Sequence, residues 1–128
     1  MTLSGSALQD VARQTAEALA EVTSGYPFTR SLLVYKVSGR VFLIITEDPD
    51  EEIITVKAEP PHIDALVTRH ESIQPGRYLD KYHWVSIGPG TGVTESLVQD
   101  LVRESYDLVV DGLPRRDRER IRGHSDGH

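Results

Sequence analysis

The chain contains no cysteine, a single tryptophan, two phenylalanines and no long hydrophobic run. Without cysteine it has no disulfide framework, no thiolate nucleophile and no thiolate ligands for zinc. No segment approaches the roughly 20 apolar residues that span a bilayer, and the first residues lack the basic and apolar regions of a signal peptide. We therefore expect a cytoplasmic protein that does not associate with membranes.

The acidic balance of the chain limits its partners. The 128 residues suffice for one domain with a hydrophobic core, and the net charge is −6. Residues 1–114 carry 9 basic and 17 acidic side chains (−8), whereas residues 115–128 carry 5 arginines and 3 acidic residues (+2). Since an acidic body repels nucleic acid, DNA binding would need a local positive patch, and we expect it to be weak and salt-sensitive.

The hydrophobic pattern predicts an α+β fold. Apolar spacing of three and four predicts helices over residues 6–23 and 62–70 and a long helix between Thr94 and Gly112. β-Branched and aromatic residues predict strands at residues 32–37, 41–46, 53–58, 76–79 and 83–88. This order favours a two-layer sandwich, an antiparallel sheet with helices packed mainly on one face and the other face at least partly open. We expect one domain over residues 1–122 and a flexible tail over 123–128, which has little apolar surface.

Five segments together carry a family resemblance. They are YPF at Tyr26–Phe28, VYKVSGRVFLIIT at Val34–Thr46, ITVKAEP at Ile54–Pro60, PGRYLDKYHWVSI at Pro75–Ile87 and SYDLVVDGLPRR at Ser105–Arg116. In these segments the chain resembles the MmcQ/YjbR family, and the resemblance covers nearly its whole length. It implies the same two-layer fold, and it implies DNA binding by two β-hairpin wings that straddle a duplex.

The resemblance also implies which residues would contact DNA. The wings would correspond to the turn at residues 38–40 and the loop around residues 77–83, and an exposed ring would contact a base or sugar. The candidate nucleic-acid contacts are Arg40, Lys57, Arg77, Tyr78, Lys81, His83 and Trp84. DNA binding is supported if the cations converge on one face away from the acidic turn at residues 47–52, and it is weakened if they lie on different surfaces.

The same residues have other interpretations, which remain open at this point. The rings of residues 78–84 could fill the core while the neighbouring cations are solvated. A second class of function is a non-enzymatic module that binds a protein or a small anionic ligand on the open sheet face. The arginines at residues 115–122 could be a solvated helix end or could add nonspecific affinity for nucleic acid. Both a monomer and a homodimer are compatible with the sequence.

No motif in the sequence predicts catalysis, a metal or a cofactor. The acidic run at residues 47–52 lacks the spacing of a calcium loop, and GPGTG at residues 88–92 lacks the lysine of a phosphate-binding loop. The chain also has no HExxH zinc motif and no GxSxG nucleophile elbow. We therefore expect a protein that is not an enzyme, with no catalytic residues, no metal site and no cofactor.

Overall fold

The computed structural model describes residues 3–125, and side chains as far as residue 123. Its helices are α1 (Gly5–Glu17), α2 (Pro60–Arg69), α3 (Glu95–Asp111) and α4 (Arg115–Ser125). Its strands are β1 (Val22–Gly25), β2 (Leu32–Val37), β3 (Arg40–Thr46), β4 (Ile54–Lys57), β5 (Ile73–Pro75) and β6 (Trp84–Ile87). The strands form one antiparallel sheet in the order β1-β2-β3-β4-β6-β5.

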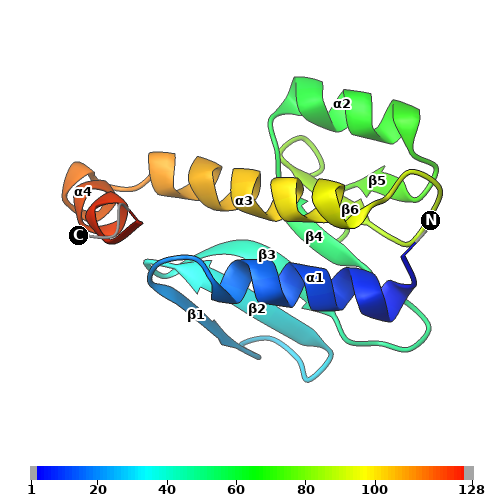
Figure 1. The fold of residues 1–128 in the computed structure, drawn as a ribbon, viewed down its shortest axis with the longest axis horizontal. Coiled ribbons are helices and arrows are strands. Elements are labelled where there is room, and N and C mark those ends of the chain that lie inside the picture. Colours follow the sequence, from blue (N-terminus) through cyan, green and yellow to red (C-terminus); the bar gives the residue numbers. More distant parts are fainter. Residues whose placement is uncertain (1–2, 126–128) are drawn as a thin grey trace.

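The helices form a second layer on one face of this sheet. Figure 1 shows α1 and α3 lying across the sheet, α2 beside the β5 and β6 strands, and α4 beyond the end of α3. The expectation of an α+β two-layer sandwich with helices mainly on one face is therefore confirmed. None of the helices in residues 3–125 is both long enough and apolar enough to cross a bilayer.

Strand register explains where the core lies. Leu33, Ile45, Ile54 and Ile87 occupy neighbouring positions on four successive strands, so their side chains form one apolar row against the helices. The alternate positions face the other way. On that opposite face the alternate residues Val34, Ile44, Thr55 and Ser86 are also buried.

Two sequence predictions of secondary structure are wrong. The first helix ends at Glu17 instead of residue 23, and Val22–Gly25 is a strand paired with β2. The helix is capped by Ala18, and Glu21, with a φ of 57°, adopts a left-handed conformation in the turn that leads into the strand. The strand predicted at residues 76–79 is a loop, because Gly76 (φ 71°) and Arg77 (φ 137°) both leave the β region. The observed strand in this region is β5, which ends at Pro75, just before the loop.

The arginine-rich segment forms a helix that is held in place by contacts distant in sequence. In α4 the side chain of Ile121 is buried, and Arg120 Nε donates to Glu21 Oε1 at 3.0 Å. Arg122 also pairs with Asp111 at the end of α3. The helix runs to Ser125 and so includes the start of the predicted tail, whereas residues 126–128 lie outside the described part of the chain.

Candidate functional site

The register of β4 and β6 places a lysine beside the only tryptophan. Lys57 and Trp84 are cross-strand partners, and Lys57 Nζ lies 6.0 Å from the centre of the indole ring. A cation at this distance is attracted to the electron-rich face of the ring. The two strands therefore present a fixed positive charge and an aromatic ring together.

A pocket opens next to this pair and is the candidate functional site. It has a volume of about 300 Å³, and we call it the cationic pocket. Its polar lining is Arg40 and Lys57, and its other lining residues are Val41, Leu79, Trp84, Leu108, Val109 and Gly112. Neither cation forms an ion pair with a carboxylate within the described residues. The pocket therefore combines two uncompensated positive charges with apolar walls.

A buried serine from α3 fixes the strand end that carries Lys57. The paired residues of β3 and β4 end at Leu43 and Val56, so the next backbone groups need other partners. Ser105 Oγ accepts the N–H of Lys57 at 2.8 Å and donates to the carbonyl oxygen of Phe42 at 2.6 Å. One hydroxyl thus bridges both strands and fixes the backbone of Lys57 at the pocket.

Arg40 reaches the pocket from the start of β3. Its Nη1 lies 3.4 Å from the carbonyl oxygen of Gly112, at the junction between α3 and α4. A bond of this length is weak, and the guanidinium has further N–H donors in its planar fork. These groups could donate hydrogen bonds to a carboxylate or phosphate in the pocket.

Arg77 is engaged elsewhere, with the acidic turn. Its Nε and Nη2 lie 3.0 and 2.7 Å from Glu51 Oε1, and hydrogen bonding to this carboxylate raises the pKa of Arg77. Tyr78 stacks near the guanidinium, at 5.6 Å from ring centre to Cζ, and its hydroxyl lies 2.9 Å from Thr46 Oγ1. Arg77 and Tyr78 therefore belong to a cluster with Glu51 and not to the cationic pocket.

His83 and Lys81 also have neighbours within their own loop. His83 Nδ1 lies 2.6 Å from Asp80 Oδ2, and this hydrogen bond lowers the pKa of Asp80. Lys81 Nζ lies 5.5 Å from the ring centre of Tyr82, which is 65% exposed. His83 is thus paired with an acid, while Lys81 and Tyr82 form an exposed pair.

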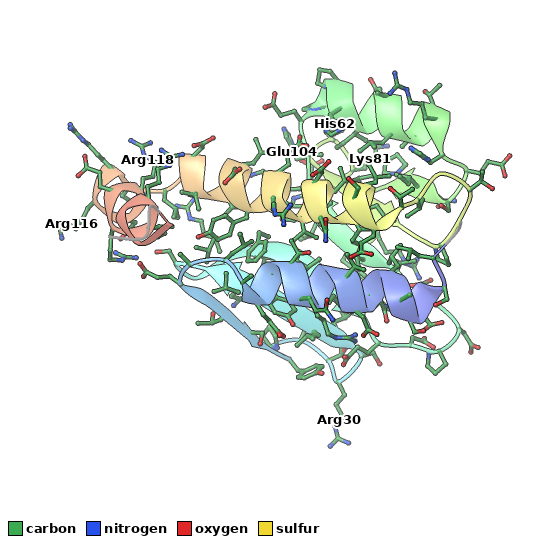
Figure 2. All side chains as sticks on the ribbon, in the orientation of Figure 1. Arg30, His62, Lys81, Glu104, Arg116 and Arg118 are labelled. Atoms are coloured by element: carbon green, nitrogen blue, oxygen red, sulfur yellow. The ribbon has the colours of Figure 1, made fainter. Side chains whose placement is uncertain are left out.

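The cations of the molecule do not gather on one surface. Figure 2 shows Arg116 and Arg118 at the α4 end and Arg30 at a separate edge, with Lys81 far from both. Of the seven residues predicted from the sequence, Arg40, Lys57 and Trp84 line one pocket, and Arg77 binds the acidic turn that DNA would avoid. Leu79 and Leu108 also line the pocket but were not predicted from the sequence, because only the folded arrangement of loop and helix brings these apolar residues there.

The acidic turn itself forms a small hairpin. Asp48 and Glu51 make an isolated antiparallel bridge, and Gln9 of α1 donates its side-chain amide to the carbonyl oxygen of Thr46 at 2.6 Å and to that of Ile53 at 3.1 Å. Within the described residues, no group of three or more histidine, aspartate or glutamate side chains is arranged to hold a metal ion. The hydrogen bonds from Gln9 join both ends of the turn to α1, which indicates a structural role for the turn.

Comparison with known proteins gives a consistent family match. The family model YjbR matches residues 17–108. A curated Escherichia coli O157:H7 relative, "Uncharacterized protein YbdF", is 35% identical over 115 residues, which are 90% of this chain and 94% of the relative. The "Uncharacterized protein YjbR" of Escherichia coli K12 is 28% identical over 83 residues, which are 65% of this chain and 70% of the relative.

Solved structures support the same fold. The crystal structure of Deinococcus radiodurans protein DR2400, with family-model domain DUF419, superposes with a TM-score of 0.79 at 28% identity. It covers 88% of this chain and 86% of that protein. A Pseudomonas syringae protein gives a TM-score of 0.63 at 16% identity over 78% of this chain and 96% of its own, which supports the fold alone.

Proposed function

The chain belongs to the YjbR family, and we propose that it is a non-enzymatic binding module for a small anionic ligand with an apolar or aromatic body. The observation that carries this proposal is the convergence of Arg40, Lys57 and Trp84 on the cationic pocket. In this proposal the ligand lies at the strand ends that carry Arg40, Lys57 and Trp84, beside the end of α3.

The chemistry of the lining defines the ligand class. A carboxylate or phosphate would receive N–H bonds from Arg40 and Lys57, and such charge-assisted bonds are stronger than neutral ones. The ligand body would lie against the Trp84 ring and the side chains of Leu79 and Leu108. A volume of about 300 Å³ is at the small end of the range for ligand sites, about 300–1,000 Å³. The pocket therefore suits a compact molecule.

A direct test uses the single tryptophan as a reporter. We expect 1-naphthoate or 1-naphthyl phosphate to shift the indole N–H resonance of Trp84 in ¹H–¹⁵N spectra, with a dissociation constant measured by calorimetry. The neutral analogue 1-naphthalenemethanol should bind much more weakly, because it leaves both cations unpaired. Arg40→Gln and Lys57→Gln should each weaken anion binding about tenfold, or ~1.4 kcal/mol.

The matched control for these variants is Arg30→Gln, which removes an exposed arginine that lies outside the pocket. It should leave the dissociation constant unchanged. If all three variants bind the anions equally well, or if the neutral analogue binds as tightly as the anions, the cationic pocket is not the site.

Nucleic acid is a second candidate ligand, favoured by one observation. Lys81 and the exposed ring of Tyr82 lie together without an acidic partner for Lys81 among the described residues. Such a pair is suited to a phosphate and a stacked base of a single strand. The acidic body and the Arg77–Glu51 pair oppose this ligand.

The Glu51→Gln variant tests this second candidate. It releases Arg77 from its carboxylate, so any affinity for labelled single-stranded or duplex DNA should rise, and the slope of log K against log salt should steepen by up to about one unit. Anisotropy titrations at several salt concentrations measure both effects. If neither the wild type nor the variant shows saturable binding at low salt, nucleic acid is not a ligand of this chain.

A further inference from the structure

The two edges of the sheet are protected differently. Strand β5 is short, ends in Pro75 and lies beside α2. Strand β1, at the other edge, has the sequence Val-Thr-Ser-Gly, with no charged residue and no proline. Natural edge strands usually carry lysine, proline or a bulge, because their free N–H and C=O groups can pair with another chain. The four residues of β1 include no lysine, no proline and no bulge.

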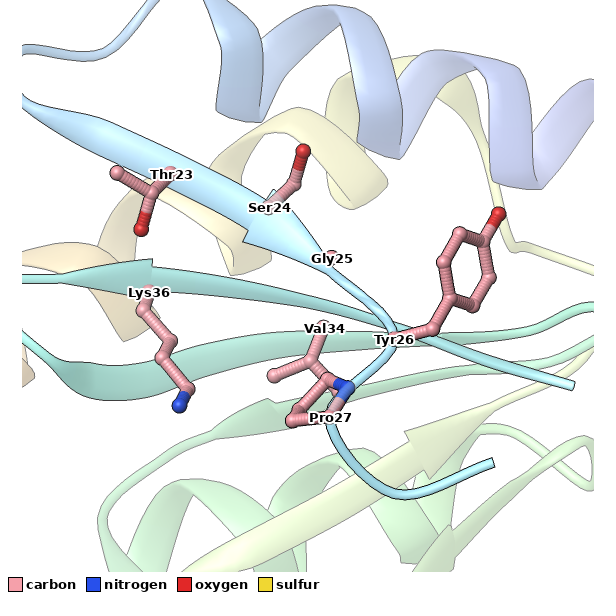
Figure 3. Close-up of a pocket in the computed structure, with 7 residues that line it drawn as sticks. All are labelled: Thr23, Ser24, Gly25, Tyr26, Pro27, Val34 and Lys36. Carbon is pink, nitrogen blue, oxygen red and sulfur yellow. The ribbon is translucent and has the colours of Figure 1, made fainter. Parts of the chain in front are cut away.

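A pocket lies directly beside this strand. It has a volume of about 350 Å³ and is lined by Thr23, Ser24, Gly25, Tyr26, Pro27, Val34 and Lys36. Figure 3 shows the side chains of Thr23 and Lys36 pointing to the same side of the sheet, with Pro27 beside Val34. A hydroxyl and an ammonium therefore lie at one end of the pocket, and apolar groups lie at the other.

The polar end of the pocket has an uncompensated positive charge. Thr23 and Lys36 are cross-strand partners. No hydrogen bond or ion pair among the described side chains engages the Lys36 ammonium. Because the charge sits next to a free strand edge, an acidic side chain on an added strand would be within its reach.

The apolar end is open. A side-chain carbon at Gly25 would have nothing within 4 Å, and Gly25 is the cross-strand partner of Val34. Thr23 and Gly25 are two residues apart, so they face the same side of the sheet. A strand paired with β1 would therefore place residues two positions apart beside Lys36 and beside the space over Gly25.

We propose that β1 is a docking edge for an extended peptide segment of a partner protein, which pairs with β1 as an additional strand. The segment carries an acidic residue that pairs with Lys36 and, two positions away, an apolar residue that fills the space beside Val34 and Pro27. Main-chain hydrogen bonds supply affinity, and the alternate side chains supply specificity. This site is separate from the cationic pocket and does not depend on it.

A second copy of the chain is a poorer occupant of this edge. Two β1 strands paired about a twofold axis would offer only valine, threonine, serine and glycine to each other. Lys36 of each copy would then remain without a carboxylate. An acidic peptide would form main-chain hydrogen bonds with β1 and an ion pair with Lys36.

The test begins with phage-displayed linear peptides selected on the full chain. We expect enrichment of an acidic residue followed or preceded, two positions away, by an apolar one. Fluorescein-labelled copies of the selected peptides should lose at least about tenfold in affinity for Lys36→Glu. Replacing the peptide's acidic residue by lysine should restore binding to this variant, which a merely structural effect would not do.

Proline variants test the strand pairing itself. Thr23→Pro and Ser24→Pro each remove one N–H, and alternate N–H groups of an edge strand point outward. The variant that keeps the wild-type melting temperature should nevertheless lose peptide binding. The proposal is overturned if selected peptides bind Lys36→Glu and both proline variants as tightly as wild type, or if none binds more tightly than about 1 mM.

Sedimentation velocity tests whether a second copy of the chain occupies the edge instead. If the free chain dimerises and the folded proline variant does not, the edge pairs with a second copy and the proposal is wrong. The Trp84 resonance should respond to 1-naphthoate equally in wild type and in Lys36→Glu, so failure at one site is distinguishable from failure at the other.

Discussion

Replacing Phe42 by alanine is expected to lower the free energy of unfolding by about 3–5 kcal/mol. The side chain is fully buried in β3, its ring meets the Tyr106 ring edge-on at 5.3 Å, and it lies 6.5 Å from the Tyr35 ring. Truncation leaves a cavity between sheet and α3 and removes both aromatic contacts. Urea denaturation followed by circular dichroism measures the loss.

The chain provides a matched control, because its other phenylalanine is on the surface. Phe28 is 64% exposed, so Phe28→Ala should change the unfolding free energy by no more than about 0.5 kcal/mol. Since domains are often stable by only about 5–15 kcal/mol, Phe42→Leu provides a milder variant if Phe42→Ala does not fold. Equal effects at the two positions would contradict the assigned core.

Much of the fold could be predicted from the sequence, because local periodicity and burial agree over most of it. The helix near residues 95–111 and the strands at 32–37 and 40–46 follow from apolar spacing and β-branched residues. The prediction failed at residues 18–25, where Val22 continued the helical spacing. Pairing with Val37 of β2 makes it a strand, and that partner is distant in the sequence.

At residues 76–79 the local sequence did indicate a turn, although a strand was predicted there. Pro75-Gly76 is a dipeptide typical of turns, and Gly76 does adopt a positive φ of 71°. The aromatic residues that follow suggested a strand, but they lie in a loop whose Arg77 and Tyr78 contact Glu51. Turn chemistry would have been the better guide at this position.

The candidate site could be predicted only in part. The sequence grouped Arg77 with Trp84 because they are close along the chain, but in the fold their side chains contact different partners. Trp84 lies beside Lys57, and Arg77 lies beside Glu51. Register depends on long-range pairing, so neither the convergence of Arg40 with Lys57 nor the neutralisation of Arg77 was visible in composition or spacing.

Ser105→Ala is the variant that connects the fold most directly to the site. Ser105 is fully buried, and its hydroxyl satisfies both the N–H of Lys57 and the carbonyl oxygen of Phe42. Each buried backbone group left without a partner costs about 1–3 kcal/mol. We therefore expect a loss of about 2–4 kcal/mol in the unfolding free energy.

Ser96→Ala, at an exposed position of the same helix, is the control and should be nearly neutral, within about 0.5 kcal/mol. Amide hydrogen exchange distinguishes the proposed bridge from simple packing, because only the bridge predicts selective loss of protection at the Lys57 N–H. An unchanged Lys57 exchange rate in Ser105→Ala would contradict the bridge. Because the same bond fixes the backbone of Lys57 beside Trp84, the variant should also weaken 1-naphthoate binding, although Ser105 does not line the cationic pocket.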